Sequence, residues 1–132
     1  MTVVYRNENS FVGPISTLKK LDNGELVIVF REALWRGSST HSDPSTRTSL
    51  LRSKDEGDSW HSKVTPDEHG AQGVSVNQLA DGSLIINNFH FSFTKKPGSV
   101  HDDWVRKLSG IHITRSTDLG YTWTPERKIP TP

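Results

Sequence analysis

The sequence predicts an all-β protein made of two four-stranded antiparallel units, and three observations lead to this prediction. An octapeptide of the form Ser-x-Asp-x-Gly-x-(Ser/Thr)-Trp occurs twice, at 53–60 and 116–123. Before each copy, at 15–30 and 74–89, an apolar run, a turn with Asp and Gly, and a second apolar run follow one another. No segment shows a convincing helical pattern. Recurrence of this kind is typical of a repeat protein.

The expected strands come in the same order in both units. The turns at Asp22–Gly24 and Asp81–Gly82, each between two apolar runs, are hairpin signatures. In the first unit we expect strands at 13–21, 25–32, 46–53 and 59–65. In the second unit we expect them at 74–79, 83–91, 110–116 and 121–128.

Four-stranded antiparallel units repeated along a chain are typical of β-propeller blades. We therefore expect a single propeller segment over 1–132, with one blade at about 10–66 and the other at about 70–129. Residues 1–9 are expected to supply a strand that completes a neighbouring blade.

Turn chemistry explains every fixed position of the octapeptide. A turn Asp accepts hydrogen bonds from backbone N–H groups a few residues on, and a Gly two positions later allows the positive φ of a tight hairpin. The Trp begins the next strand and buries a large ring. We therefore expect structural roles for Ser53, Asp55, Gly57, Trp60, Ser116, Asp118, Gly120 and Trp123.

The hairpin followed by the octapeptide resembles the sialidase-type propeller, whose bacterial neuraminidase (BNR) repeat carries an Asp-box of this form. The resemblance extends from about Ser10 to Ile129. It is more specific for architecture than for activity, because non-enzymatic domains and several glycosidase families also carry the box. It implies a full propeller of six blades.

Two blades cannot close a ring, because propellers have about 4–8 of them. We expect a homotrimer, in which three copies supply six blades through a head-to-tail interface that closes. The chain begins just before one blade and ends just after another, which favours assembly in our interpretation. The alternative is a fragment of a longer protein.

The amino-acid composition limits the classes of partner and the chemistry that we expect. Sixteen Lys and Arg against 15 Asp and Glu give a formal net charge of +1, so nothing indicates nucleic acid or an anionic membrane as a partner. Cysteine is absent, which excludes disulfides and thiolate chemistry. The sequence shows neither a signal peptide nor an apolar stretch of membrane-spanning length, and it leaves the compartment open.

The loops at 33–45 and 92–109 are expected to open on the face where the sialidase-like family has its glycan pocket. Trp stacks on a pyranose ring, Arg pairs with carboxylates, and Asp accepts hydrogen bonds from sugar hydroxyls. The same mix also suits an ordinary ion-paired surface loop, and the two Trp also suit packing at a blade interface. The ligand-binding candidates in and around these loops are Arg31, Glu32, Trp35, Arg36, His41, His69, His101, Asp102, Asp103 and Trp104.

The resemblance also implies catalytic positions. Sialidases open their first blade with Phe-Arg-Ile-Pro, and the matching stretch here is Phe11–Pro14, with Val12 where the carboxylate-binding Arg would stand. Arg31 matches the family's other first-blade arginine, and Asp43 falls where the family places its general acid/base. The family's Tyr nucleophile and its Glu partner belong to later blades.

Three functions remain open. We favour a glycan-binding, sialidase-like segment with an incomplete catalytic set. The alternatives are a glycoside hydrolase fragment of exo-sialidase type that missing blades complete, and a structural or protein-interaction propeller without a small ligand.

The sequence predicts no cofactor and no metal site. None of the six histidines forms a pair at a known zinc spacing. We expect His90 and His112 to be packed, hydrogen-bonded rings in strands. As an alternative, a three-fold ring would bring His41, His69 and His101 round its axis, where they would suit a bound ion.

Overall fold

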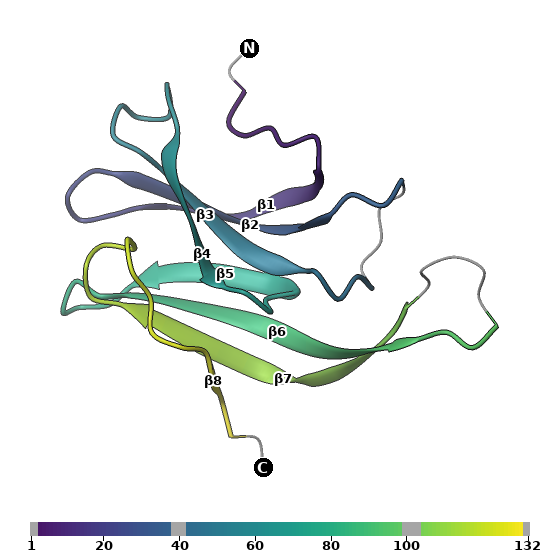
Figure 1. Cartoon of the computed structure of the whole chain (residues 1–132). Helices are drawn as coiled ribbons and strands as arrows, with labels where there is room; N and C mark the ends of the chain where they lie inside the picture. The colour runs from purple at the N-terminus through teal and green to yellow at the C-terminus, as the bar shows by residue number, and fades with distance from the viewer. Residues whose placement is uncertain (1–2, 38–41, 99–103, 131–132) are drawn as a thin grey trace.

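The computed structural model describes residues 3–37, 42–98 and 104–130, and it contains two four-stranded antiparallel sheets (Figure 1). Sheet A consists of β1 (Ser10–Lys20), β2 (Leu26–Leu34), β3 (Arg47–Ser53) and β4 (His61–Asp67). Sheet B consists of β5 (Gln72–Gln78), β6 (Leu84–Lys95), β7 (Trp104–Ser116) and β8 (Arg127–Lys128). Strand order follows chain order in each sheet, and the described residues contain no helix. The all-β prediction is confirmed.

Sheet B differs from the expected strands in two ways. The connection predicted at 92–109 is shorter, because β6 and β7 continue and pair as far as Lys95 and Trp104. Phe91 and Phe93 alternate with polar residues there, which suits a half-exposed hairpin. The last strand contains only Arg127–Lys128 instead of 121–128. Pro125 lies in the missing part, and proline cannot donate a ladder hydrogen bond.

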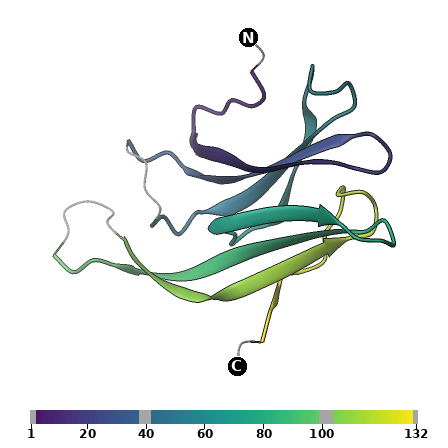
Figure 2. The same cartoon turned by 180° about the vertical axis from the view of Figure 1, so that it is seen from behind.

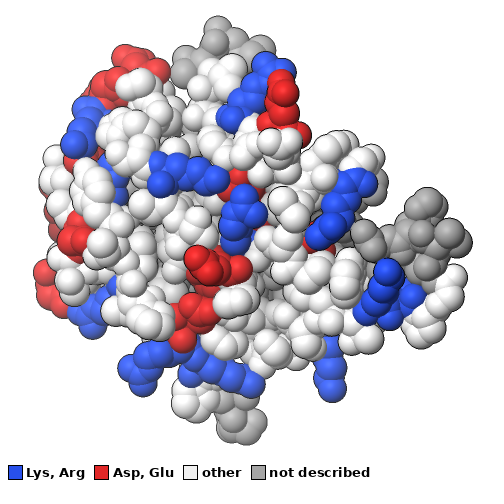
Figure 3. Space-filling view, viewed as in Figure 1, with Lys and Arg blue, Asp and Glu red and all other residues white. Residues whose placement is uncertain are grey.

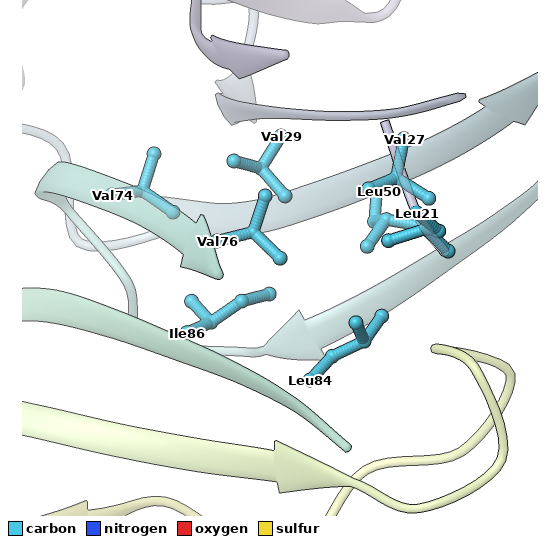
Figure 4. Packing of buried hydrophobic residues seen from close by; sticks show 8 residues of the cluster. All are labelled: Leu21, Val27, Val29, Leu50, Val74, Val76, Leu84 and Ile86. Atoms are coloured by element: carbon cyan, nitrogen blue, oxygen red, sulfur yellow. The ribbon is translucent and has the colours of Figure 1, made fainter. Parts of the chain in front are cut away.

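The main core lies between the two sheets (Figure 4). Each buried Val or Leu side chain stabilises the fold by about 1.5–3 kcal/mol. The cluster draws on β2 and β3 of sheet A and on β5 and β6 of sheet B, so it fixes how the sheets stack. Its members are Leu21, Val27, Val29, Leu50, Val74, Val76, Leu84 and Ile86.

A second, smaller cluster covers the other face of sheet A. Ile28, Phe30 and Leu51 are buried there, and Val4 and Tyr5 from the N-terminal segment pack against them. Residues 3–7 form no strand in the single chain, and they lie across sheet A instead (Figure 2). Their use as a strand of a neighbouring blade stays a prediction, because it concerns a second copy of the chain.

The two Asp-box turns have the same internal geometry. In the first, Asp55 accepts hydrogen bonds from Ser53 Oγ at 2.8 Å and from Ser59 N at 2.8 Å, and Trp60 Nε1 donates to Gly57 O at 3.1 Å. Glu56 and Gly57 both have positive φ, 59° and 96°, as the two central residues of a type I′ turn require.

The second box repeats this network at the equivalent positions. Asp118 accepts from Ser116 Oγ at 2.7 Å and from Thr122 N at 2.9 Å, and Trp123 Nε1 donates to Gly120 O at 2.9 Å. In each box, hydrogen bonds from the Ser or Thr that follows the turn lower the pKa of the Asp to about 2. The octapeptide is thus a self-contained turn that leads into a partly buried Trp.

Candidate ligand-binding site

The strand registers place the two kinds of connection at opposite ends of the sheets. Ser10 at the start of β1 pairs with Leu34 at the end of β2, whereas Leu26 at the start of β2 pairs with Ser53 at the end of β3. The Asp-box turns therefore lie at the end away from the β2–β3 connection. In Figure 1 the box turns are at the left, and the β2–β3 and β6–β7 connections are at the right.

A pocket of about 280 Å³ lies where the first strands of the two sheets, β1 and β5, run side by side. It belongs to the end of the sheets opposite the Asp-boxes, because both strands contribute their first halves. Its wall combines two aromatic rings, several small residues and one cation. The lining residues are Phe11, Gly13, Pro14, Ser16, Arg31, Ala71, Gln72, Gly73, Val74 and Phe89.

Arg31 supplies the positive charge of this pocket. It is only 7% exposed, its Nε donates to Thr46 Oγ1 at 2.8 Å, and its guanidinium lies 5.4 Å from the centroid of the Phe11 ring. Burial lowers the pKa of Arg31, and the charge of Asp43 partly offsets this effect. An arginine stays protonated in proteins even so. The pocket therefore presents a fixed cation beside aromatic surface.

Thr46 ties this cation to the crossover between the sheets. Its hydroxyl, which accepts from Arg31, is also 3.2 Å from the carbonyl oxygen of Gly70 and donates to it. The pocket wall and the β4–β5 crossover are thus held together by one buried hydrogen-bond chain.

Asp43 is a buried anchor of the β2–β3 connection. Its carboxylate accepts from Ser45 N at 2.9 Å, from Ser45 Oγ at 2.6 Å and from Arg36 Nε at 2.8 Å. Burial alone would raise the pKa of Asp43, but these hydrogen bonds outweigh it and the pKa lies below its ordinary value. A general acid at neutral pH needs the opposite shift. The local geometry therefore disfavours Asp43 as an acid and suits it to holding Arg36.

Glu32 lies on the other face of sheet A from Arg31, because successive strand residues point to opposite sides. It is fully buried and accepts from Tyr5 Oη at 2.7 Å, Ser49 Oγ at 2.6 Å and Lys63 Nζ at 2.6 Å. This places Glu32 away from the pocket, contrary to its assignment as a ligand-binding candidate. Its role is to join the N-terminal segment to β3 and β4.

The charge of Glu32 leads to a prediction about pH. Burial would raise the pKa of Glu32, yet hydrogen bonds from Lys63, Ser49 and Tyr5 lower it to about 2 from an ordinary 4.5. Because the folded-state pKa is depressed, the stability that Glu32 contributes is present above about pH 4.5 and is lost as the pH falls through about 2.

We expect Glu32→Gln to lower the free energy of unfolding by about 2 kcal/mol at pH 7 and by much less near pH 2, measured by urea unfolding. The exposed Glu8→Gln is the control and should match the wild type at both pH values. A loss in Glu32→Gln that stays the same from pH 7 to pH 2 would show that its charge is not what stabilises the fold.

The remaining candidates among the described residues do not line the pocket. Trp35 is half exposed and is not among the lining residues, and Trp104 begins β7 opposite Lys95. His69 contacts Glu126 instead of the pocket. Val12 is 37% exposed and also lies outside the lining. The candidates His41, His101, Asp102 and Asp103 lie outside the described residues.

Sequence reasoning missed a buried polar cluster between the sheets. Asp67 Oδ2 accepts from His90 Nε2 at 2.7 Å and from Asn88 Nδ2 at 3.2 Å, and the His90 ring stacks on His112 with centroids 3.8 Å apart. One signal could have found it: Asn88 and His90 continue the inward-facing alternation of Leu84 and Ile86 in β6. His90 is indeed a packed, hydrogen-bonded ring, but its partner is a buried carboxylate of the other sheet.

The charged side chains that can be seen on one face of the molecule are of both signs. Figure 3 shows acidic and basic side chains intermixed on one face of the molecule. Within the described residues, no helix is long and apolar enough to cross a membrane.

Comparison with known proteins leaves the function open. No protein-family model and no curated protein matches the chain. A crystal structure of a protein of unknown function from Dyadobacter fermentans is similar over 98% of this chain, with 26% sequence identity and a TM-score of 0.76. The chain spans 39% of that protein's chain.

Proposed function

We propose that this chain is a two-blade segment of a sialidase-like BNR propeller, and that its pocket between β1 and β5 binds a carbohydrate that carries a carboxylate. One observation carries the proposal: the buried Arg31 lies in the wall of a pocket that also offers the rings of Phe11 and Phe89. Arginine pairs with carboxylates, and an aromatic ring packs on the apolar face of a sugar.

Two features of the fold support the propeller part of the proposal. Both sheets have four strands in chain order, with matching Asp-box turns between the third and the fourth strand. The first strands of the two sheets, β1 and β5, also lie next to each other, as Thr17 Oγ1 shows by donating to Val74 O at 3.3 Å. Neighbouring blades of a propeller place their first strands side by side round the axis.

Binding is favoured over hydrolysis. Asp43 is fixed in an ion pair with Arg36 and has a lowered pKa, so it lacks the property that a general acid needs. A glycosidase also needs two working groups across the scissile bond, and the described residues that line the pocket include no carboxylate. A hydrolytic function would require residues from other blades.

We also propose that three copies close a six-bladed ring. In the described part of sheet B, Val105 and Leu108 of β7 leave 56% and 55% of their surface exposed, and a neighbouring copy would cover such apolar surface. Light scattering after size-exclusion chromatography measures the mass directly. A particle three times the mass of the 14.8 kDa chain supports the ring, and a stable monomer contradicts it.

Isothermal titration calorimetry tests the binding proposal. We expect a carboxylated monosaccharide to bind with a dissociation constant of roughly millimolar or tighter, and its uncharged amide to bind at least about tenfold more weakly. Equal affinity for acid and amide would show that Arg31 does not select the carboxylate. No heat with any sugar would leave a structural or protein-interaction role.

A further inference from the structure

Three side chains that can bind metals converge where the β4–β5 crossover meets sheet B. Asp67 is the last residue of β4, His69 follows it in the crossover, and Glu126 lies directly before β8. One nitrogen or oxygen from each lies within 4.8 Å of the others. The group therefore lies where the two sheets meet, and none of its three residues belongs to the pocket lining.

Asp67 is held in place for such a role. It is 1% exposed, and its carboxylate accepts from His69 N at 2.9 Å as well as from His90 and Asn88. These hydrogen bonds engage both carboxylate oxygens, so the carboxylate cannot rotate freely, which suits a metal ligand.

The other two groups are accessible and able to adjust. The side chains of His69 and Glu126 are 67% and 28% exposed, and His69 Nδ1 lies 2.6 Å from Glu126 Oε1. Ligand atoms round a tetrahedral Zn²⁺ are about 3.3 Å apart, given bonds of roughly 2.0–2.1 Å. Small side-chain rotations take the present spacing to that value, and the exposed side leaves room for a water as the fourth ligand.

We propose that Asp67, His69 and Glu126 form a binding site for a divalent transition-metal ion, best suited to Zn²⁺, that fastens the two sheets together. One imidazole and two carboxylates are a donor set that Zn²⁺ accepts. Carboxylates that bind metals are usually hydrogen-bonded to a further side chain that orients them, and His90 donates such a hydrogen bond to Asp67. Stacking on His112, with the rings 9° from parallel, keeps His90 in that position.

The test compares the untagged chain, freed of metal by a chelator, with and without Zn²⁺. We expect one Zn²⁺ per chain by calorimetry and a rise in the unfolding temperature of at least about 3 °C at saturation. Co²⁺ should give visible absorption bands that Zn²⁺ abolishes, which identifies a shared inner-sphere site.

Variants assign the site to these residues. His69→Ala and Glu126→Gln should each weaken Zn²⁺ binding roughly tenfold or more. Both chains should still fold, because His69 is exposed and Gln keeps the shape of the partly buried Glu126. The matched controls are His61→Ala in β4 and the exposed Glu68→Gln in the same crossover, which should bind as the wild type does. Unchanged binding in His69→Ala and Glu126→Gln, or no saturable binding below about 1 mM, overturns the proposal.

Discussion

Replacing Arg52 with alanine should lower the free energy of unfolding by about 3–5 kcal/mol, because it empties the space of a large buried side chain and removes a charge-assisted hydrogen bond to the partly buried Glu25. Arg52 is fully buried. Its Nη1 donates to Glu25 Oε2 at 2.9 Å, and its Nη2 donates to Leu119 O at 2.9 Å, in the Asp-box turn of the other sheet. Its guanidinium also lies 3.7 Å from the centroid of the Tyr121 ring. One side chain of β3 thus joins sheet A to the second Asp-box.

Urea unfolding of three variants separates charge from packing. Arg52→Met keeps most of the buried volume and loses only the polar contacts, so we expect a smaller loss of about 1–3 kcal/mol. Arg127→Ala removes an exposed arginine of β8 and should change stability by less than about 0.5 kcal/mol. If Arg52→Ala costs no more than Arg127→Ala, the junction between the sheets does not depend on Arg52.

Replacing Arg31 with methionine should weaken the binding of a carboxylated sugar about 10–140-fold, because a charge-assisted pair contributes roughly 1.5–3 kcal/mol and each 1.4 kcal/mol is a factor of ten. Methionine keeps the apolar stem that packs near Phe11, so the pocket should keep its shape. Arg31→Lys retains the charge but not the planar pair of donors, and we expect a loss smaller than that of Arg31→Met. Calorimetry with the same sugar measures all three affinities.

Two controls make this result specific. Arg115→Met removes an exposed arginine that pairs with Asp81 at the Asp-box end of sheet B, and affinity should not change. Thr46→Val removes the hydroxyl that positions Arg31 but leaves the charge, so a loss of only a few-fold is expected. A loss in Arg115→Met equal to that in Arg31→Met would indicate that net charge governs binding instead of the pocket.

Local chemistry explains which parts of the fold were predictable. Asp55 and Gly57 hold their turn through contacts within a few residues, so the sequence alone identifies the turn and the strands on either side. The pairing of β6 with β7 as far as Lys95 and Trp104 is a contact between two separate segments of the chain. The local sequence of either segment does not show where this pairing ends.

The site was harder to predict for two physical reasons. Val27, Ile28, Val29 and Phe30 are all buried, so the apolar pattern of β2 does not show which face looks toward sheet B. Strand alternation puts Arg31 and Glu32 on opposite sides, but that pattern does not tell which of the two faces sheet B. The Asp67–His90 contact joins two sheets across 23 positions, and it follows from how the sheets stack.

Backbone amide shifts in a ¹⁵N-labelled sample, titrated with a carboxylated monosaccharide, test the central claim most directly. The account predicts saturable shifts at the amides that border the pocket, such as Gly13, Ala71 and Gly73. It predicts no shifts at Gly57 and Gly120, in the Asp-box turns at the opposite end of the sheets. Shifts confined to the Asp-box end, or none at any sugar concentration, would contradict a carbohydrate site between β1 and β5.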